Sequence, residues 1–343
     1  YLLMNEIPFL IPLISALSSF LIIFVVRFID VFEREPYKLL FINFLFGIFA
    51  YLLSVISVSS TYSFFNFNNQ ILNLNEKFIF ISILLSSGLM LIYQLIFSFL
   101  SLILFKRDFD TMPDFIIYFS TIGIGYNFGE VFFVDLLNKT NNQFFLEISE
   151  NLYFSSFFSG STLPFLMAGI GAGIYLNKIS KKNKKFEKLR GLSVFFILIS
   201  LITQIIFYSM NSMITLTSTH SPSEFINIVN QVKYFANSLS ITILIGSVGF
   251  AVMFDAYIIS NFLEKVLLSS EKKFSKIVKF SNFINPFLYL SISKLKYFSA
   301  FKNDKDINEK VLKTITKLAF KNFNDPENSS IYISEAYEIL EKP

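Results

Sequence analysis

Two carboxyl side chains, those of Glu130 and Asp255, stand inside long apolar stretches of the sequence. An ionisable group in the hydrocarbon layer of a membrane costs about 2.5 kcal/mol or more, so each is a candidate functional residue. Glu130 could act as a catalytic carboxylate, and Asp255 could bind a ligand or form one step of an ion path. Either could instead be structural and hydrogen-bonded within a helix bundle, with Asn127 as a nearby partner for Glu130.

The residue types that the chain lacks narrow the chemistry further. The sequence has no cysteine and one histidine, His220, which excludes thiolate metal sites, disulfides and any site that needs two imidazoles. His220 stands in a polar segment and is expected to be solvated. The amides of Gln94 and Gln204, in other apolar stretches, are expected to form hydrogen bonds between helices. Gln94 also remains a candidate catalytic residue.

The elements that must position these groups are membrane helices. Of the 343 residues, 53% are hydrophobic and 16% are charged, and the mean hydropathy is +0.57, whereas soluble domains have about 25% charged residues. A helix needs about 20 apolar residues to cross the hydrocarbon layer. The sequence therefore predicts an all-α, polytopic bundle of about seven transmembrane helices, at residues 8–26, 39–60, 78–105, 115–134, 152–176, 191–213 and 236–262.

The distribution of Lys and Arg predicts the orientation of this bundle. Twelve of the fifteen basic residues before residue 264 fall in alternate connections, in the segments 27–38, 106–107 and 178–190. Because basic residues collect in cytoplasmic loops, we expect the N-terminus outside, the C-terminus in the cytoplasm, and the protein in the inner (cytoplasmic) membrane. Orientation and contact with anionic membrane lipid account for the cluster at 178–190, so nucleic-acid binding is not expected.

Residues 264–343 differ in character from the span-rich residues 1–263 and are predicted to form a cytoplasmic or interfacial helical tail. The segment 283–301 mixes aromatic residues with lysines, which is typical of a helix that lies among lipid headgroups. Apolar residues at helical spacing then predict an amphipathic helix that ends near Pro326, and a second short helix is expected at 330–341. This pair could form a hairpin that faces another membrane protein or a cytoplasmic protein.

A run of acidic and aromatic residues, Arg107-Asp108-Phe109-Asp110-Thr111-Met112-Pro113-Asp114, precedes the fourth predicted span, and Tyr118 and Tyr126-Asn127-Phe128-Gly129-Glu130 lie within that span. Three further stretches accompany it: Glu33 to Pro36, the Gly-rich fifth span and the sixth span. Together these features resemble the PrsW family of intramembrane metalloproteases, which is related in fold to the CAAX-processing proteases. The likeness covers roughly residues 27–213. It implies binding roles for Asp110, Asp114, Tyr118 and Tyr126 beside Glu130.

The resemblance also implies a zinc ion held by carboxylate and imidazole, with water as the nucleophile. At the family's glutamate pair and lysine in the third span this sequence has Tyr93, Gln94 and Phe97. Its histidine position in the fifth span falls near Ser161, and that in the sixth span falls near Thr203 or Gln204. Only Glu130 remains, and one carboxylate supplies one of the three protein ligands that a catalytic zinc usually needs. We therefore expect no bound metal and no other cofactor.

These observations favour a catalytically inactive PrsW-like membrane protein that acts as a scaffold, a substrate-binding decoy or a sensor. Two alternatives remain open. One is an active intramembrane protease with a zinc site rebuilt around Glu130, Gln94 and Asp255; the other is an ion- or proton-coupled transporter that uses Glu130 and Asp255. The surroundings of Glu130 distinguish these three functions. An apolar shell indicates a structural carboxyl, a polar environment indicates a binding site, and a ring of ligand atoms indicates a metal site.

Overall fold

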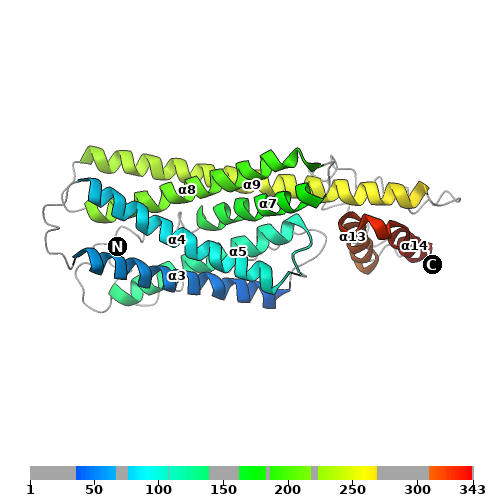
Figure 1. Ribbon diagram of the computed structural model, residues 1–343, viewed down its shortest axis with the longest axis horizontal. Helices are drawn as coiled ribbons and strands as arrows, with labels where there is room; N and C mark the ends of the chain where they lie inside the picture. The colour runs from blue at the N-terminus through cyan, green and yellow to red at the C-terminus, as the bar shows by residue number, and fades with distance from the viewer. Residues whose placement is uncertain are drawn as a thin grey trace, which may run out of the picture. The chain divides into compact units, whose positions relative to one another are not determined.

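The computed structural model describes residues 36–66, 76–106, 108–138, 162–182, 186–217, 223–268 and 309–341. Every regular element in these ranges is helical, which confirms the prediction of an all-α protein. Figure 1 shows the elements: α3 (Tyr37–Asn66), α4 (Glu76–Leu104), α5 (Met112–Asn138), α7 (Thr162–Lys182), α8 (Leu189–Thr217), α9 (Ser223–Leu268), α13 (Glu309–Asn324), the short 3-10 helix η3 (Pro326–Asn328) and α14 (Ser329–Glu341).

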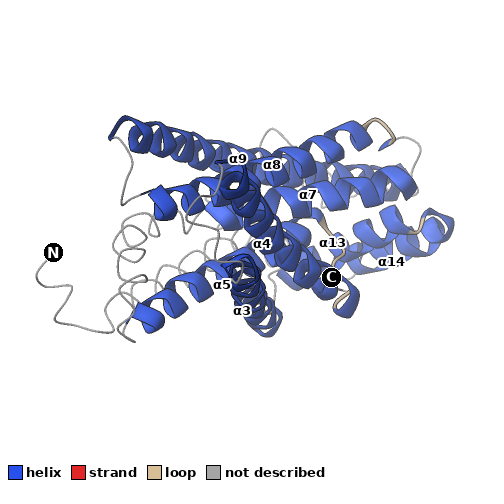
Figure 2. Cartoon of the chain, turned by 60° about the vertical axis from the view of Figure 1, so that its left-hand side comes forward, coloured by secondary structure: helices blue, strands red, loops and turns tan. Residues whose placement is uncertain are grey.

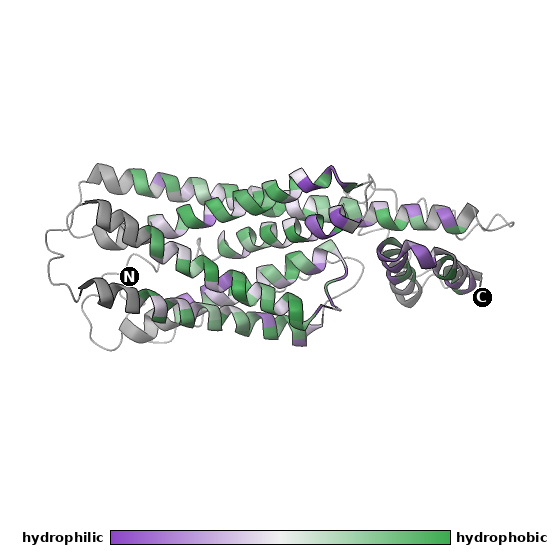
Figure 3. Ribbon diagram, in the orientation of Figure 1, coloured by the Kyte–Doolittle hydropathy of each residue, from purple (hydrophilic) through white to green (hydrophobic). Residues whose placement is uncertain are grey.

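Four of the described helices are long and apolar enough to cross a membrane, which agrees with the prediction of a membrane-embedded protein. These candidate spans are Tyr37–Val58 in α3, Leu84–Leu104 in α4, Leu189–Met210 in α8 and Tyr234–Ile259 in α9. Colouring by hydropathy shows the apolar residues running along all four helices (Figure 3).

The apolar side chains of these four helices are directed outward as well as inward. One residue of each helix illustrates this, since all four of the following side chains are more than half exposed: Phe41, Ile96, Phe195 and Ile245. A protein surface lined by large apolar groups is costly in water but suits contact with lipid chains. The outward faces of α3, α4, α8 and α9 therefore suit contact with lipid.

Helices α5 and α7 differ from these four, because most of their described residues are buried. We call α5 and α7 the sheathed helices. Residues 114–127 of α5 are all buried, as is nearly all of α7 from Thr162 to Ser180. A helix that does not touch lipid need not be uniformly apolar, so these two can carry Gly, Ser, Thr and Asn. The predicted spans 115–134 and 152–176 fall on α5 and α7; both are helical over their described residues, but neither is among the four candidate spans.

Glycine allows the sheathed helices to approach their neighbours backbone to backbone. A Cβ built on Gly125 of α5 would collide with the Phe44 carbonyl oxygen of α3, and one on Gly171 of α7 would collide with the Phe115 carbonyl oxygen of α5. A Cβ on Gly123 would lie 2.9 Å from the Cα of Pro164. Inside a membrane the hydrophobic effect does not drive helices together, so their association depends on the close van der Waals packing that small residues at such crossings allow.

The described chain divides into two compact units. Unit 1 contains Glu35–Phe109 and Asp114–Ser247, and unit 2 contains Asp110–Pro113 and Val248–Pro343. Within unit 1, α3 packs on α4, α4 on α8 and α8 on α7; Figure 2 gives a second view of these helices.

Unit 2 contains the predicted tail hairpin. The amphipathic helix is α13, which ends at Asn324 just before Pro326, and the second helix is α14. The two helices pack against each other, so the predicted hairpin is confirmed. The predicted helices at 8–26 and 283–301 lie outside the described residues. The count of seven spans, the orientation and the domain boundary near residue 264 stay predictions.

Candidate functional site

The centre of unit 1 holds two glutamine side chains bonded to each other. Gln94 comes from α4 and Gln204 from α8, and both are fully buried. The Gln204 Nε2 group donates to Gln94 Oε1, and Gln94 Nε2 donates to the hydroxyl oxygen of Tyr208. The sequence predicts hydrogen bonds between helices for these amides, and the α4–α8 contact provides them.

Tyr208 packs against Tyr126 of α5, which begins a second hydrogen-bonded pair. The Tyr208 and Tyr126 rings meet edge to face at 6.1 Å. The Tyr126 hydroxyl lies 2.9 Å from Ser54 Oγ, which itself donates to the Tyr51 carbonyl oxygen at 2.7 Å. Because the single Ser54 hydrogen is used in that bond, Tyr126 is the donor to Ser54.

We call Gln204, Gln94, Tyr208, Tyr126 and Ser54 the polar web. Its members belong to α3, α4, α5 and α8, so the web crosses the centre of unit 1. Hydrogen bonds join Gln204, Gln94 and Tyr208 and, separately, Tyr126 and Ser54, which is how buried polar groups avoid the cost of desolvation. One end is open, because Gln204 Oε1 is buried and has no hydrogen-bond partner among the described residues.

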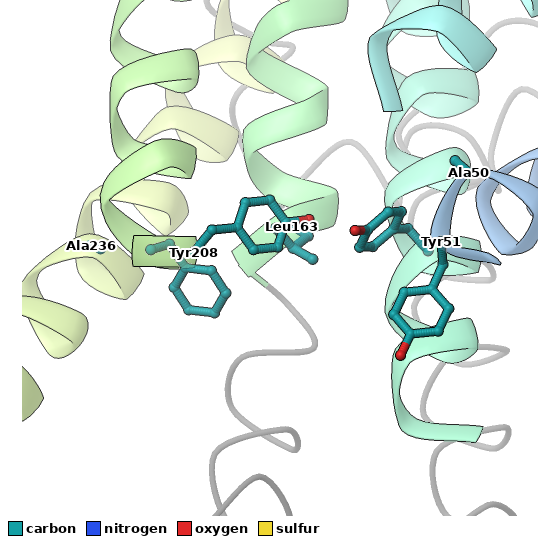
Figure 4. Close-up of a cluster of buried hydrophobic side chains, with 7 residues drawn as sticks. Ala50, Tyr51, Leu163, Tyr208 and Ala236 are labelled. Carbon is teal, nitrogen blue, oxygen red and sulfur yellow. The ribbon is translucent and has the colours of Figure 1, made fainter. Parts of the chain in front are cut away.

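An apolar and aromatic shell surrounds the polar web. Tyr51 packs edge to face on Tyr126 with ring centroids 5.4 Å apart. The same buried cluster contains Ala50, Leu163, Phe207 and Ala236. Figure 4 shows that these residues come from several helices, with Tyr51 and Tyr208 on opposite sides of the view. The helices thus enclose the web in side chains that exclude water.

Glu130 lies at the margin of this cluster. It follows Tyr126 by one helical turn on α5, so the two side chains share a face, and Glu130 is half-buried. Tyr126 in turn packs on Tyr208, the hydrogen-bond partner of Gln94. Of the predicted site residues, Gln94 and Tyr126 therefore lie on either side of Tyr208, and Glu130 lies one helical turn beyond Tyr126.

The predicted binding residues Asp114 and Tyr118 belong to a different cluster at the start of α5. Asp114 is buried in the first turn, where the positive helix end favours a carboxylate. Phe109 is buried beside the Tyr118 ring at 4.8 Å and the Phe115 ring at 4.8 Å. Lys178 of α7 donates to the Phe109 carbonyl oxygen at 3.0 Å and stands 5.3 Å from the centre of the Phe115 ring. These contacts anchor the start of α5.

The remaining predicted binding residues, Asp110 and Asp255, belong to unit 2. Asp110 is exposed, and Asp255 on α9 is 2% exposed. Beside it, Phe254 meets Phe323 of α13 edge to face at 5.9 Å. Glu130 belongs to unit 1, so the two carboxyl groups that stand in apolar stretches of the sequence, Glu130 and Asp255, lie in different compact units.

Sequence reasoning missed Tyr208, Tyr51 and Ser54. The available signal was spacing: Tyr208 follows Gln204 by four residues and Ser54 follows Tyr51 by three, so each pair shares a helix face. Tyr93 makes a further contact between helices, with its hydroxyl 2.6 Å from Ser57 Oγ.

The donor set of the polar web does not fit zinc. Zinc sites use thiolate, imidazole and carboxylate, whereas the web offers amide, phenol and hydroxyl groups that are already hydrogen-bonded to one another. Among the described residues, no group of three or more His, Asp or Glu side chains comes together. Ser161 and His220 lie outside those residues. The expectation that the chain binds no metal stays a prediction.

Comparison of the chain with family models, with curated proteins and with solved structures finds no match.

Proposed function

We propose that this chain is a PrsW-like membrane protein that has no protease activity and acts as a scaffold or sensor in the cytoplasmic membrane. One observation carries the proposal. Gln94 and Gln204 occupy or adjoin positions that the resemblance assigns to metal ligands, and their side chains are bonded directly to each other. That contact is expected if both positions face a common centre, as they would in the family. In this chain the side chains at that centre are uncharged amides.

The hydrogen bonding of the polar web supports a structural role for that centre. A general base or a metal ligand must offer a free lone pair to its substrate or ion. Gln94 uses its acceptor and a donor on α8, and Tyr126 donates to Ser54 of α3. These bonds join α4 to α8 and α5 to α3, and such fixed contacts between helices are what a scaffold requires.

The tail hairpin is the element that we propose faces a partner. Among the side chains of the hairpin that the structure describes, one large apolar group is well exposed, that of Ile331 on α14, at 60%. Lysines and glutamates surround the rest of the pair. In this proposal the spans hold the hairpin at the membrane, and the hairpin makes the contact.

A gain of metal binding tests whether the glutamines stand at former ligand positions. In the double variant Gln94→Glu/Gln204→His, Glu130 would join two restored ligand types, and we expect the purified protein to bind zinc at about one ion per chain, against none for the natural sequence. The matched control is Gln231→His with Gln94→Glu, because Gln231 is an exposed glutamine of α9. Equal zinc content in the test and control variants would contradict the positional correspondence.

A second experiment separates a scaffold from an enzyme. In cells, Glu130→Gln should leave the activity of the protein intact, because the carboxylate has no catalytic task, whereas Ile331→Glu should reproduce the phenotype of a deletion without lowering the amount of protein in the membrane. Cleavage of a membrane protein by the purified chain, abolished by Glu130→Gln, would overturn the proposal.

A further inference from the structure

The two helices of the tail hairpin carry opposite charge. Helix α13 contains four lysines and a single glutamate, whereas α14 contains three glutamates and no basic residue. A hairpin with one basic and one acidic helix presents two distinct surfaces, and the basic one is arranged regularly.

The lysines of α13 recur at the spacing of one helix face. They stand at 310, 313, 317 and 321, and residues three or four apart lie above one another on a helix. Lys317 and Lys321 are exposed, while Ile315 and Leu318 are 0% and 2% exposed. At 100° per residue the four lysine positions fall within an arc of about 80° that contains neither Ile315 nor Leu318. We call the four positions the basic face of α13.

A packing contact in unit 2 places this face near the end of an apolar span. Phe323 of α13 packs on Phe254 of α9 at 5.9 Å, and the candidate span in α9 ends at Ile259. Phe254 therefore stands five residues before the end of the span, which is about 7.5 Å along the helix. Tyr257 is 48% exposed, as expected of an aromatic side chain at the membrane–water boundary.

We infer that the basic face of α13 binds the headgroups of anionic phospholipids. Lys321 precedes Phe323 by two residues, so the side chain that anchors α13 to the span and a lysine of the basic face are close along the helix axis. Lysine chains reach from apolar surroundings to charged headgroups, and each lysine near an anionic surface adds to the attraction. An acidic soluble protein would meet the same charge but would not explain the anchoring at Phe254.

This inference goes beyond the proposed function and does not depend on it, because it involves neither Glu130 nor the polar web. It gives the tail a lipid ligand and makes its attachment to the membrane sensitive to lipid charge and to salt.

The test uses the full chain in nanodiscs that contain equal amounts of phosphatidylglycerol and phosphatidylcholine. After release, native mass spectrometry counts the lipids that each protein retains, and a titration with short-chain phosphatidylglycerol gives the affinity. For Lys317→Gln/Lys321→Gln we expect affinity for phosphatidylglycerol to fall about 10- to 30-fold, with affinity for phosphatidylcholine unchanged. Lys317→Arg/Lys321→Arg should restore binding, and Glu335→Gln/Glu338→Gln on α14 is the control that should not reduce it.

Three outcomes would overturn the inference. The first is equal retention of phosphatidylglycerol by the natural protein and the Lys→Gln variant when both have the same helix content and elution volume. The second is displacement of the lipid by inorganic phosphate alone, which would identify a phosphate site and not a membrane contact. The third is that the Lys→Gln variant loses binding to an acidic protein partner but keeps its binding to phosphatidylglycerol. That result would assign the basic face of α13 to a protein and not to lipid.

Discussion

The side-chain amides of Gln94 on α4 and Gln204 on α8 are hydrogen-bonded to each other in the buried centre of unit 1. These residues are separated by 110 positions in the sequence, so the bond depends on the packing of two membrane helices. Gln94 makes a second hydrogen bond to α8, at Tyr208, whose ring packs on Tyr126 of α5. Removing either amide should therefore weaken the contact between α4 and α8.

We expect Gln94→Leu to destabilise the protein by about 1–2 kcal/mol, because it leaves the Gln204 amide and the Tyr208 hydroxyl without a partner in a region that excludes water. The double variant Gln94→Leu/Gln204→Leu should cost less than the sum of the two single changes, since both members of the pair are then apolar. Reversible unfolding in detergent micelles, measured for all four proteins of the cycle, gives these values.

The matched control for this cycle is Gln231→Leu, because Gln231 is exposed on α9. Its stability should stay within about 0.5 kcal/mol of the natural protein. If the costs of the two core substitutions simply add, the amides are not energetically coupled, and the polar web would not be the cooperative unit that the hydrogen bonds indicate.

The sequence predicts part of this site and misses part of it for an identifiable reason. Glu130 and Gln94 are conspicuous because polar groups in apolar spans are costly and few. Tyr208 and Ser54 are not conspicuous, because tyrosine and serine are ordinary members of such spans, and their importance depends on which helices meet. The tertiary arrangement of α3, α5 and α8 supplies that information, and no local pattern contains it.

Glycine substitutions test the close approach of the sheathed helices. Gly125→Ala and Gly171→Ala should each lower stability by about 1–3 kcal/mol, because the new methyl group would collide with a backbone carbonyl of a neighbouring helix, which cannot move without separating the pair. Gly88→Ala on α4 is the control, since a Cβ there meets nothing within 4 Å. It should be neutral or slightly stabilising, because alanine favours helix more than glycine does.

The same unfolding assay applies, together with the yield of folded protein after extraction. A Gly171→Ala protein as stable as Gly88→Ala would show that α5 and α7 do not approach as closely as the structure has them.

Lys178 offers a test of the cluster at the start of α5. Lys178→Met keeps the length of the side chain but removes its hydrogen bond to the Phe109 carbonyl oxygen and its contact with the Phe115 ring. We expect a loss of about 1–3 kcal/mol, because the carbonyl loses a charged donor and the ring loses a cation. Lys181→Met, one turn further along α7 and exposed, should change stability much less. Equal effects of the two substitutions would show that the anchoring is not energetically important.

The fold was predictable to the extent that hydropathy and helix-end signals determine it. Apolar length predicts α3, α4, α8 and α9, and helical spacing with the stop at Pro326 predicts α13 and α14. Hydropathy does not reveal that α5 and α7 are sheathed, because a buried helix and a lipid-facing helix can have similar compositions. That distinction depends on which faces are covered, as at Gly125 and Gly171, and is a property of the assembled bundle.

Acid should loosen the turn of the tail hairpin. Asp325 accepts hydrogen bonds from Asn328 Nδ2 at 2.9 Å and from the Tyr332 hydroxyl at 3.1 Å. These bonds, first that of Asn328, hold the pKa of Asp325 below its ordinary value of 3.8. Because the folded form binds the proton less readily than the unfolded chain, the bonds stabilise the turn fully above that ordinary value. The stabilisation is lost as the pH falls through the lower pKa of the folded form.

Since the chain has no cysteine, spin labels on cysteines introduced at Lys321 and Glu335 report the distance between α13 and α14 without further changes. The distance distribution should be narrow near neutral pH and should broaden below the ordinary pKa of an aspartate. Asp325→Asn should remove this response, because no carboxylate is left to titrate, whereas Glu327→Gln in the same turn should retain it. A response that persists unchanged in Asp325→Asn would place the acid-sensitive group elsewhere.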